Sequence, residues 1–497
     1  MKLLSYNTLK EISYDGFLLP EAPERILQFG EGNFLRAFVD YFVDVLNEKT
    51  DFHSKVVVCQ PTARNTELAE KFAKQDGLYT LYLRGFQNGE TVNQKRVISC
   101  ISRCLNAYRD FEELLHCAEN PELRYIVCNT TEAGIVYDPT CQLADAPASS
   151  YPGKLTQFLY RRYQKFDGDM GKGFVVLPCE LIDDNGRKLE RCVLQYADQW
   201  QLGEDFIHWI QKANVFCSTL VDRIVTGYPK NEMDAITAEN GYIDHLVDTG
   251  EIFGFWVMEG PPSLKEELPF EKAGLPVLVT DHYKPYQQRK VRILNGAHTS
   301  FVLGAYLAGK NMVGECMDDP VIRKFIEQTI YQEILPTLDL PKKEEEEFAH
   351  AVIERFQNPF IHHALLSIAL NSTSKWKSRV LPSLKGYVQK TGQIPPCISA
   401  SFAFYIAFYR GHAFQNHTLI GYRNGEEYPI KDDHCVLQFY YDHQNENTET
   451  LVHAVSSNTS FWGEDLSLIP GLETAVIKYL KDLEEKGAYE VMRECIK

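Results

Sequence analysis

The densest group of polar side chains in this sequence lies between residues 284 and 298. On a helix of 3.6 residues per turn, Lys290, Asn295 and His298 fall within an arc of about 140°. Hydride addition to a carbonyl leaves an alkoxide, and a partly buried lysine can protonate it when desolvation lowers its pKa. An amide and an imidazole can donate hydrogen bonds to the same oxygen. The stretch predicts a proton-transfer site, with a basic helix that only caps, pairs or faces solvent as the alternative.

A second chemical signal follows the apolar run at residues 25–29. Gly30 permits a tight turn, and Gly32 permits close approach of a pyrophosphate to the backbone. The following helix, predicted over residues 33–47, would present free N–H groups and the positive end of its dipole. Leu35 stands where a third glycine would complete the usual dinucleotide motif, so a turn without a ligand is an alternative. The predicted cofactor contacts from this segment are Phe29, Gly30, Gly32, Asn33 and Phe34.

The form of the dinucleotide is left open by the next strand, at residues 55–60. It ends without an acid to hold a ribose 2′-hydroxyl, which would mark NAD, while Arg64 could favour the 2′-phosphate of NADP. The strand at residues 125–128 ends in a polar segment, where nicotinamide contacts are common in doubly wound sheets and a plain turn is equally compatible. The predicted cofactor contacts there are Asn129, Thr130, Thr131 and Glu132.

Strands alternating with helices in the first half predict an α/β domain with a parallel sheet. A further strand is expected at residues 174–177, helices at 155–163 and 189–200, and an inserted hairpin from the runs 79–84 and 96–102. The second half contains strand-like runs at residues 253–258 and 276–279 and then becomes helical. We therefore expect a Rossmann-type domain over residues 1–280 and a mainly α-helical domain over 281–497. The helices expected in the second half are residues 291–308, 320–334, 343–356, 361–370, 396–409 and 472–486.

Composition narrows the class of protein. Lys and Arg number 51 against 68 Asp and Glu, and a net charge of −17 argues against nucleic acid and anionic membranes as partners. No apolar run is long enough to span a membrane, and the N-terminus lacks the pattern of a secretory signal. The 13 cysteines show no zinc-ligand spacing, so we expect free thiols in the cytoplasm and no metal site. The oligomeric state is left open.

The chain resembles the polyol-specific long-chain dehydrogenases, or mannitol dehydrogenase family. Residues 217–224 look like the family signature, Gly30 to Ala37 like its cofactor loop, and Lys290 with Asn295 and His298 like its catalytic spacing. The likeness is strongest to members that act on the sugar acids tagaturonate and altronate. It is carried by residues 25–40, 129–134, 179–183, 216–229, 284–299, 358–359, 363 and 365–371.

The resemblance implies a metal-independent, NAD-dependent oxidoreductase with a small sugar-acid substrate. It implies Lys290 as general acid/base, with Asn295 and His298 holding the reacting oxygen. Asp222 and Lys375 match substrate-side positions of the family.

Two departures set the chain apart from the polyol-oxidising members. Leu181 follows Glu180 where those members have Asn, and Ser367 stands at the position of their substrate-side Arg. A reductase of fructuronate or a mannitol-type 2-dehydrogenase remains the alternative. A uronate carboxylate would need a cationic partner, and we expect Lys375 to serve. The other available cations are Arg36, Lys154, Arg223, Lys284 and Arg289.

Overall fold

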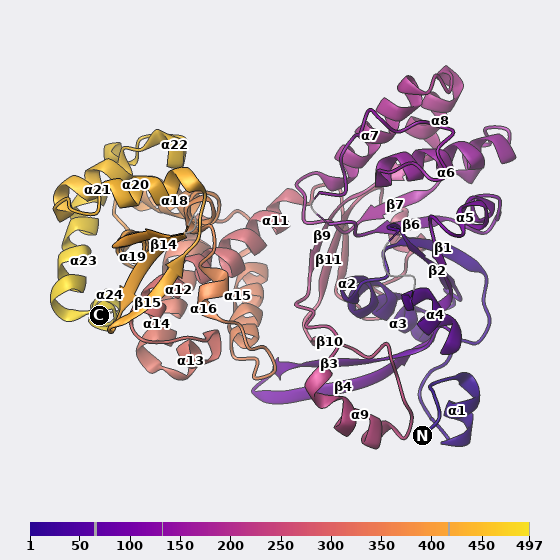
Figure 1. The fold of residues 1–497 in the computed structure, drawn as a ribbon, viewed down its shortest axis with the longest axis horizontal. Coiled ribbons are helices and arrows are strands. Elements are labelled where there is room, and N and C mark those ends of the chain that lie inside the picture. Colours follow the sequence, from indigo (N-terminus) through magenta and orange to yellow (C-terminus); the bar gives the residue numbers. More distant parts are fainter. Residues whose placement is uncertain (64–66, 132, 416–417, 497) are drawn as a thin grey trace. The chain divides into compact units, whose positions relative to one another are not determined.

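The computed structural model describes residues 1–63, 67–131, 133–415 and 418–496. Contacts within the chain divide it into two compact units (Figure 1). Unit 1 comprises residues 1–85 and 91–283, and unit 2 comprises residues 86–90 and 284–497.

A parallel sheet of six strands forms the centre of unit 1. Its strand order, β5-β2-β1-β6-β7-β8, reverses direction at β1, as in doubly wound dinucleotide-binding folds. The carboxyl ends of β1 and β6 therefore lie side by side at this reversal, where such folds bind their ligands. The strands are β1 (Glu24–Phe29), β2 (Lys55–Gln60), β5 (Ile101–Asn106), β6 (Tyr125–Cys128), β7 (Val175–Pro178) and β8 (Val215–Phe216).

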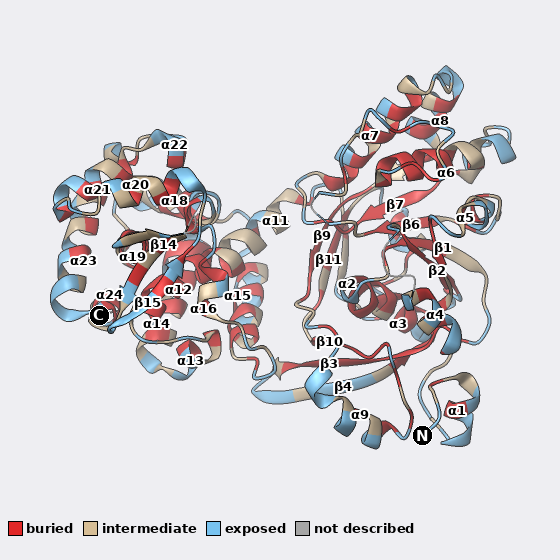
Figure 2. Ribbon diagram, viewed as in Figure 1, coloured by how far each residue is buried: buried red, intermediate tan, exposed pale blue. Residues whose placement is uncertain are grey.

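Hydrophobic side chains form a core cluster on each face of this sheet, and its strands are coloured mostly as buried in Figure 2. Because successive side chains of a strand point to opposite faces, Ile26 and Leu27 enter different core clusters, as do Val56 and Val57. The helical segment after β1 packs in one cluster, and α5 to α8 pack in the other. The helices of unit 1 are α1 (Tyr6–Glu11), α2 (Asn33–Leu35), a π-helical turn (Arg36–Asp40), α3 (Tyr41–Lys49), α4 (Glu67–Lys74), α5 (Phe111–Cys117), α6 (Tyr151–Lys165), α7 (Asn185–Gln199), α8 (Glu204–Ala213), α9 (Met233–Asn240) and α10 (Leu264–Glu267).

Two smaller sheets complete unit 1 and lie outside the parallel sheet. One has the order β10-β3-β4 and the other β12-β11-β9. Their strands are β3 (Tyr79–Gln87), β4 (Glu90–Ile98), β9 (Ser218–Asp222), β10 (Asp248–Glu251), β11 (Phe255–Glu259) and β12 (Val277–Thr280).

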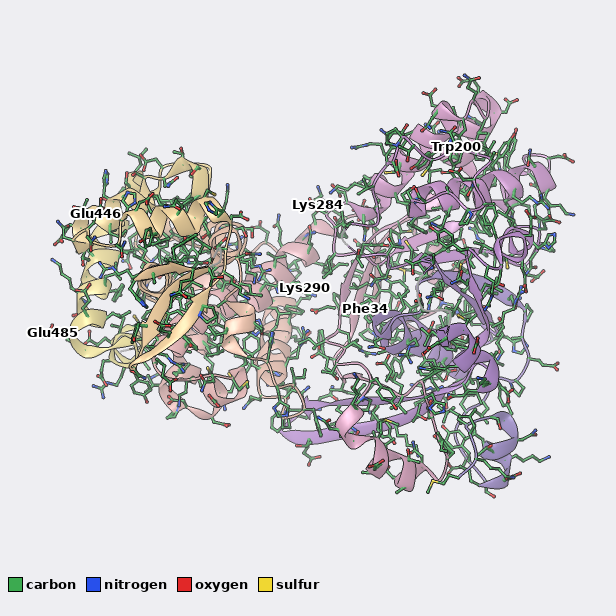
Figure 3. The ribbon with its side chains drawn as sticks, in the orientation of Figure 1. Phe34, Trp200, Lys284, Lys290, Glu446 and Glu485 are labelled. Atoms are coloured by element: carbon green, nitrogen blue, oxygen red, sulfur yellow. The ribbon has the colours of Figure 1, made fainter. Side chains whose placement is uncertain are left out.

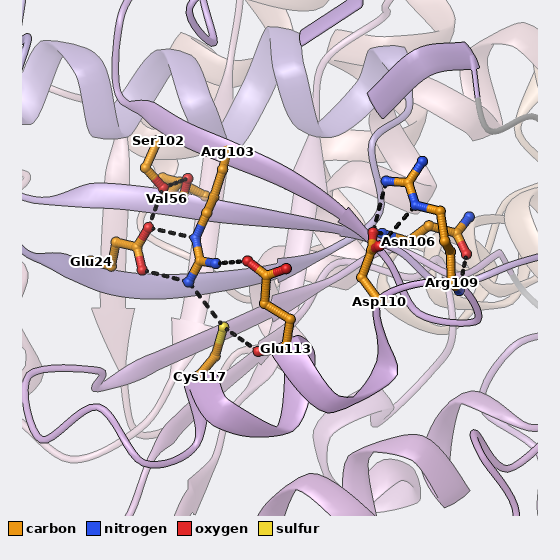
Figure 4. A network of polar contacts seen from close by, with 9 residues as sticks. All are labelled: Glu24, Val56, Ser102, Arg103, Asn106, Arg109, Asp110, Glu113 and Cys117. Carbon is orange, nitrogen blue, oxygen red and sulfur yellow. Dashed lines mark hydrogen bonds and ion pairs between the residues drawn. The ribbon is translucent and has the colours of Figure 1, made fainter. Parts of the chain in front are cut away.

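The run 96–102, expected as one arm of a hairpin, belongs to two different strands. Asp44 accepts hydrogen bonds from the Ser99 backbone N–H at 2.7 Å and from its hydroxyl at 3.1 Å, which separates β4 from β5. β5 then joins the edge of the parallel sheet, where the Arg103 guanidinium binds Glu24 at 2.9 and 3.0 Å (Figure 4). That part of the prediction is wrong because a buried carboxylate redirects the chain.

Unit 2 is mainly helical and is built around α12 and α19, which are buried on almost every side (Figure 2). A Cβ on Gly304 would lie 2.4 Å from the Phe404 ring, so this glycine allows the two helices to approach closely. The helices of unit 2 are α11 (Lys284–Lys290), a π-helical turn (Val291–Asn295), α12 (Gly296–Leu307), α13 (Val313–Asp318), α14 (Pro320–Gln328), a π-helical turn (Thr329–Ile334), α15 (Lys342–Phe356), α16 (Leu365–Ile368), α17 (Ser372–Lys375), a π-helical turn (Trp376–Val380), α18 (Leu381–Thr391), α19 (Pro396–Tyr409), α20 (His434–Asp442), α21 (Thr448–Ser456), α22 (Thr459–Trp462), α23 (Leu472–Lys486) and α24 (Ala488–Cys495).

The helix expected over residues 361–370 is largely absent. Only α16 is helical there. The backbone carbonyl of His363 accepts a hydrogen bond from the Val313 N–H at 3.0 Å, and the Leu365 N–H donates to the backbone carbonyl of Asn311 at 2.8 Å. This pairing holds the segment extended and fixes the position of His363. The small antiparallel sheet of β13 (Ala413–Gln415), β14 (Thr418–Arg423) and β15 (Glu426–Ile430) was not expected either.

The two units confirm the expected fold class, a Rossmann-type α/β domain followed by a mainly α-helical one. Within the described ranges, no helix combines the length and the apolar character that crossing a bilayer requires.

Candidate active site

A pocket of about 460 Å³ opens at the carboxyl ends of β1, β2 and β6 in unit 1. Gly30 has a φ of +132°, a conformation that L side chains rarely adopt, and its missing side chain leaves room for Leu35. A Cβ on Gly32 would meet nothing within 4 Å, so the backbone at Gly32 faces open space in the pocket. Gly32 also caps the helix that follows, whose first N–H groups suit a diphosphate. These residues fit a dinucleotide.

Five of the predicted cofactor contacts line this pocket: Gly30, Gly32, Asn129, Thr130 and Thr131. Three others are engaged elsewhere. Phe29 is fully buried against Tyr151, Phe34 stacks on Phe38, and Asn33 accepts a hydrogen bond from Arg36 at 2.5 Å. Glu132 and Arg64 lie outside the described residues.

The loop after β6 is held by a buried acid that follows β7. Glu180 accepts hydrogen bonds from the Thr130 N–H at 2.8 Å and from its hydroxyl at 2.9 Å. Burial raises the pKa of Glu180 above its usual value, and the two hydrogen bonds from Thr130 offset part of this rise. Thr131 has a φ of +75°, which is strained for a β-branched residue. Strain of this kind is found where the surrounding structure dictates a functional geometry.

Lys154 is the pocket residue with the most distinctive electrostatics. It is only 2% exposed, and its ammonium donates to the Ser149 carbonyl at 2.8 Å and to the Tyr108 hydroxyl at 3.3 Å. Burial lowers the pKa of Lys154 to about 8. Both of these hydrogen-bond partners are neutral, so an anionic ligand would supply countercharge. Sequence reasoning ranked Lys154 only among the available cations, although Ser150, which caps α6, places it one turn into that helix.

Two of the other candidate cations in unit 1 bind the unit's own backbone. Arg36 donates to the Leu246 carbonyl, and Arg223 donates to the carbonyls of Phe253 at 2.9 Å and Ala37 at 2.5 Å. Asp222, a predicted substrate contact, ends β9 and is 4% exposed.

The predicted catalytic residues lie on one helical segment of unit 2 that runs from Lys284 to Leu307. Lys290, labelled in Figure 3, ends its first part, α11. Its side chain is half-buried. A π-helical turn follows and ends at Asn295. The angles between Lys290, Asn295 and His298 around the helix axis therefore differ from those expected for a regular α-helix. π-helical turns often occur at functional sites.

His298 is the most enclosed of the three, at 6% exposure. Its ring lies 4.3 Å from the Phe356 ring and 5.4 Å from the His363 ring, measured between centroids. Within the described structure, its Nε2 atom has no hydrogen-bond partner. Burial lowers the pKa of His298 well below its usual value, and nearby positive charges add to this effect. The imidazole is therefore neutral near pH 7 and can exchange a hydrogen bond with a ligand oxygen.

Lys375, the predicted substrate contact of unit 2, ends α17 and donates to the Ile368 carbonyl at 2.8 Å. Burial and the charge of Arg379 lower its pKa. Ser367 is exposed and donates to the Ala364 carbonyl at 2.7 Å. Among the residues that the structure covers, no group of three or more His, Cys, Asp or Glu is arranged to hold a metal ion.

Sequence models of two adjoining domains match most of the chain. The model of the mannitol dehydrogenase Rossmann domain matches residues 24–272, and that of the mannitol dehydrogenase C-terminal domain matches residues 282–484. The chain belongs to the mannitol dehydrogenase family. The family resemblance drawn from the sequence is thereby confirmed.

Within the mannitol dehydrogenase family, the chain is similar to curated proteins over nearly its whole length. It is 47% identical to altronate oxidoreductase of Klebsiella pneumoniae over 98% of this chain and 99% of that protein. It is also 47% identical to altronate oxidoreductase of Yersinia enterocolitica, over 94% and 95%. Among solved structures, D-sorbitol dehydrogenase matches with a TM-score of 0.79 and 23% identity over 99% and 100% of the two chains. Mannitol 2-dehydrogenase of Pseudomonas fluorescens matches with a TM-score of 0.68 and 21% identity over 99% of each chain.

Proposed function

We propose that this chain is an NAD-dependent oxidoreductase that interconverts D-altronate and D-tagaturonate. The observation that carries the proposal is the 46–47% identity, over 94–98% of the chain, to proteins named altronate oxidoreductase. The pocket beside Gly30 and Gly32 supports dinucleotide binding. NAD is the form found with the Pseudomonas mannitol 2-dehydrogenase, whose fold this chain shares.

In this proposal, the Lys290 ammonium donates its proton to the carbonyl oxygen of the substrate during reduction, and the neutral amine takes it back during oxidation. A dinucleotide held beside Gly30 and Gly32 would supply the hydride for reduction or accept it on oxidation. Asn295 and the neutral His298 donate hydrogen bonds to the same oxygen, where negative charge develops. A neutral imidazole suits this role, because a second acid at the site would compete with Lys290 for the oxygen. Asp222 and Lys375 hold other groups of the substrate.

We also place the reaction in the cytoplasm. All 13 cysteines are described and free, and most are buried, which fits a reducing compartment.

NADH oxidation measured with tagaturonate, fructuronate and fructose, and repeated with NADPH, tests the proposal. We expect the highest kcat/KM with tagaturonate and NADH. A higher value with fructuronate or fructose would transfer the assignment to that substrate, and a higher value with NADPH would refute the cofactor assignment.

A further inference from the structure

Several basic side chains surround His298 within unit 2. Charges on His363, Arg355, Arg379 and Lys375 all disfavour protonation of the imidazole. His363 is in ring contact with His298, and the charge of Lys375 also disfavours protonation of His363. These four groups come from α15, the segment before α16 and the stretch 375–379, and they lie around His298 of α12.

Arg379 lies near His298 because its backbone packs directly against the helical segment from Lys284 to Leu307. A Cβ on Gly296 would lie 3.0 Å from the Arg379 carbonyl oxygen, so the glycine lets the π-helical turn Trp376–Val380 approach two residues before His298. Lys375 lies four residues before Arg379, and each charge is felt at His298. The Lys375 ammonium is turned toward the Ile368 carbonyl, at 2.8 Å.

The half-buried Arg379 guanidinium is paired with no carboxylate in the part of the chain that the structure describes. The acid that acts on neighbouring Lys375 is Asp432. Its Oδ2 atom already accepts hydrogen bonds from the Thr373 N–H at 3.1 Å, the Thr373 hydroxyl at 2.8 Å and the Tyr409 hydroxyl at 2.5 Å. A partly desolvated guanidinium without an acid is costly unless an anion binds it.

We propose that Arg379, assisted by Lys375, binds the carboxylate of the sugar-acid substrate and selects it over neutral sugars. This inference rests on the proposed function. The guanidinium presents a planar fork of N–H donors that matches the two oxygens of a carboxylate. A sugar with a primary alcohol at that end would leave this charge unpaired, and so would bind poorly.

Kinetics of Arg379→Met with two substrates test the proposal: tagaturonate, and the matching ketohexose in which a primary alcohol replaces the carboxylate. For tagaturonate we expect kcat/KM to fall about 30- to 100-fold, mainly through KM, because bonds to charged groups are lost. For the neutral ketose we expect a change of less than about threefold. Inhibition by altronate against the corresponding alditol reports the same contrast if the neutral ketose reacts too slowly.

Two variants and one binding measurement control the experiment. Lys377→Met removes an exposed cation from the same π-helical turn and should leave kcat/KM unchanged for both substrates. Arg379→Lys should recover part of the loss, since charge is kept and the fork is not. NADH affinity should be unchanged in every variant, which shows that the protein is folded.

Equal losses for the acid and the neutral sugar, or no loss for either, would overturn the role of Arg379. Failure of the proposed function looks different. If the wild-type enzyme reduces fructuronate but not tagaturonate, the proposed substrate is wrong. The effect of Arg379→Met on the acid and on the neutral sugar is then compared with fructuronate and fructose. A wild-type enzyme that prefers neutral ketoses overturns both proposals.

Discussion

In the proposed mechanism, a single residue, Lys290, delivers the proton to the substrate. We expect Lys290→Ala to lower kcat by about 10²- to 10⁴-fold, because general acid catalysis contributes about that much. NADH affinity should be kept, since the dinucleotide pocket is formed by unit 1 and Lys290 belongs to unit 2. Gln288→Ala, an exposed position on the same helix, is the matched control. Stopped-flow measurement of NADH oxidation separates the two effects. A turnover within a few-fold of wild type would remove Lys290 from the mechanism.

Gly32 gives a second residue-level prediction. The space around its missing Cβ is open, so Gly32→Val should fold normally while its branched side chain occupies the space of the pyrophosphate. We expect the Kd for NADH to rise more than about 100-fold, or about 3 kcal/mol, with little change in melting temperature. Gly314→Val, in α13 of unit 2, also meets nothing within 4 Å and should leave NADH binding intact. Unchanged NADH fluorescence titration of Gly32→Val would contradict the assignment of the pocket.

At the scale of elements, Glu333 links two helical segments of unit 2. Its two carboxylate oxygens accept hydrogen bonds from the N–H groups of Cys397 and Ile398, each at 2.8 Å, in the first turn of α19. Glu333→Ala leaves these buried donors without partners, and we expect it to cost about 1–3 kcal/mol of unfolding free energy. Glu347→Ala, exposed on α15, is the control and should change stability by less than about 0.5 kcal/mol. Equal denaturation midpoints for both variants would disprove the cap.

The same acid makes stability depend on pH. Burial raises the pKa of Glu333 from 4.5 to about 7, so the folded protein binds this proton more tightly than the unfolded chain. Stability from this group is therefore greatest at low pH and falls as pH rises from about 4.5 to 7. The isosteric Glu333→Gln should remove that slope. Urea denaturation of both proteins at pH 5 and pH 8 measures it, and an identical pH dependence would show that Glu333 does not titrate in this range.

Sequence patterns predicted the elements whose burial is continuous and local. The strands at 55–60 and 125–128 are short apolar runs and were found with correct bounds, as was the helix at 396–409. Patterns failed where a distant contact decides the conformation: Asp44 redirects the chain at Ser99. Lys154 and Arg379 could not be singled out, because their significance comes from burial and nearby partners rather than from spacing.

At the scale of the whole molecule, NADH should stabilise the protein through unit 1. The dinucleotide pocket draws on segments from residue 30 to residue 154, so binding should favour the folded state of that unit. At 100 times the Kd, we expect about 2.7 kcal/mol of stabilisation. In differential scanning calorimetry, NADH should raise the melting temperature of the wild type and leave that of Gly32→Val unchanged. Hydrogen exchange should slow around residues 30–36 and 129–154, and slowing confined to unit 2 would contradict the placement of the cofactor.

The hairpin between β3 and β4 has a practical consequence for dissecting the molecule. Its tip, residues 86–90, is grouped with unit 2, and there the Asn88 N–H donates to Glu354 at 2.6 Å. The polypeptide thus changes unit at 85/86, at 90/91 and again at 283/284. A single cut after Tyr283 would leave the tip, with Asn88, on the N-terminal fragment. Its hydrogen-bond partner Glu354 would be on the C-terminal fragment. We therefore expect truncation at this boundary to separate Asn88 from Glu354, so that neither fragment keeps all the contacts of its unit.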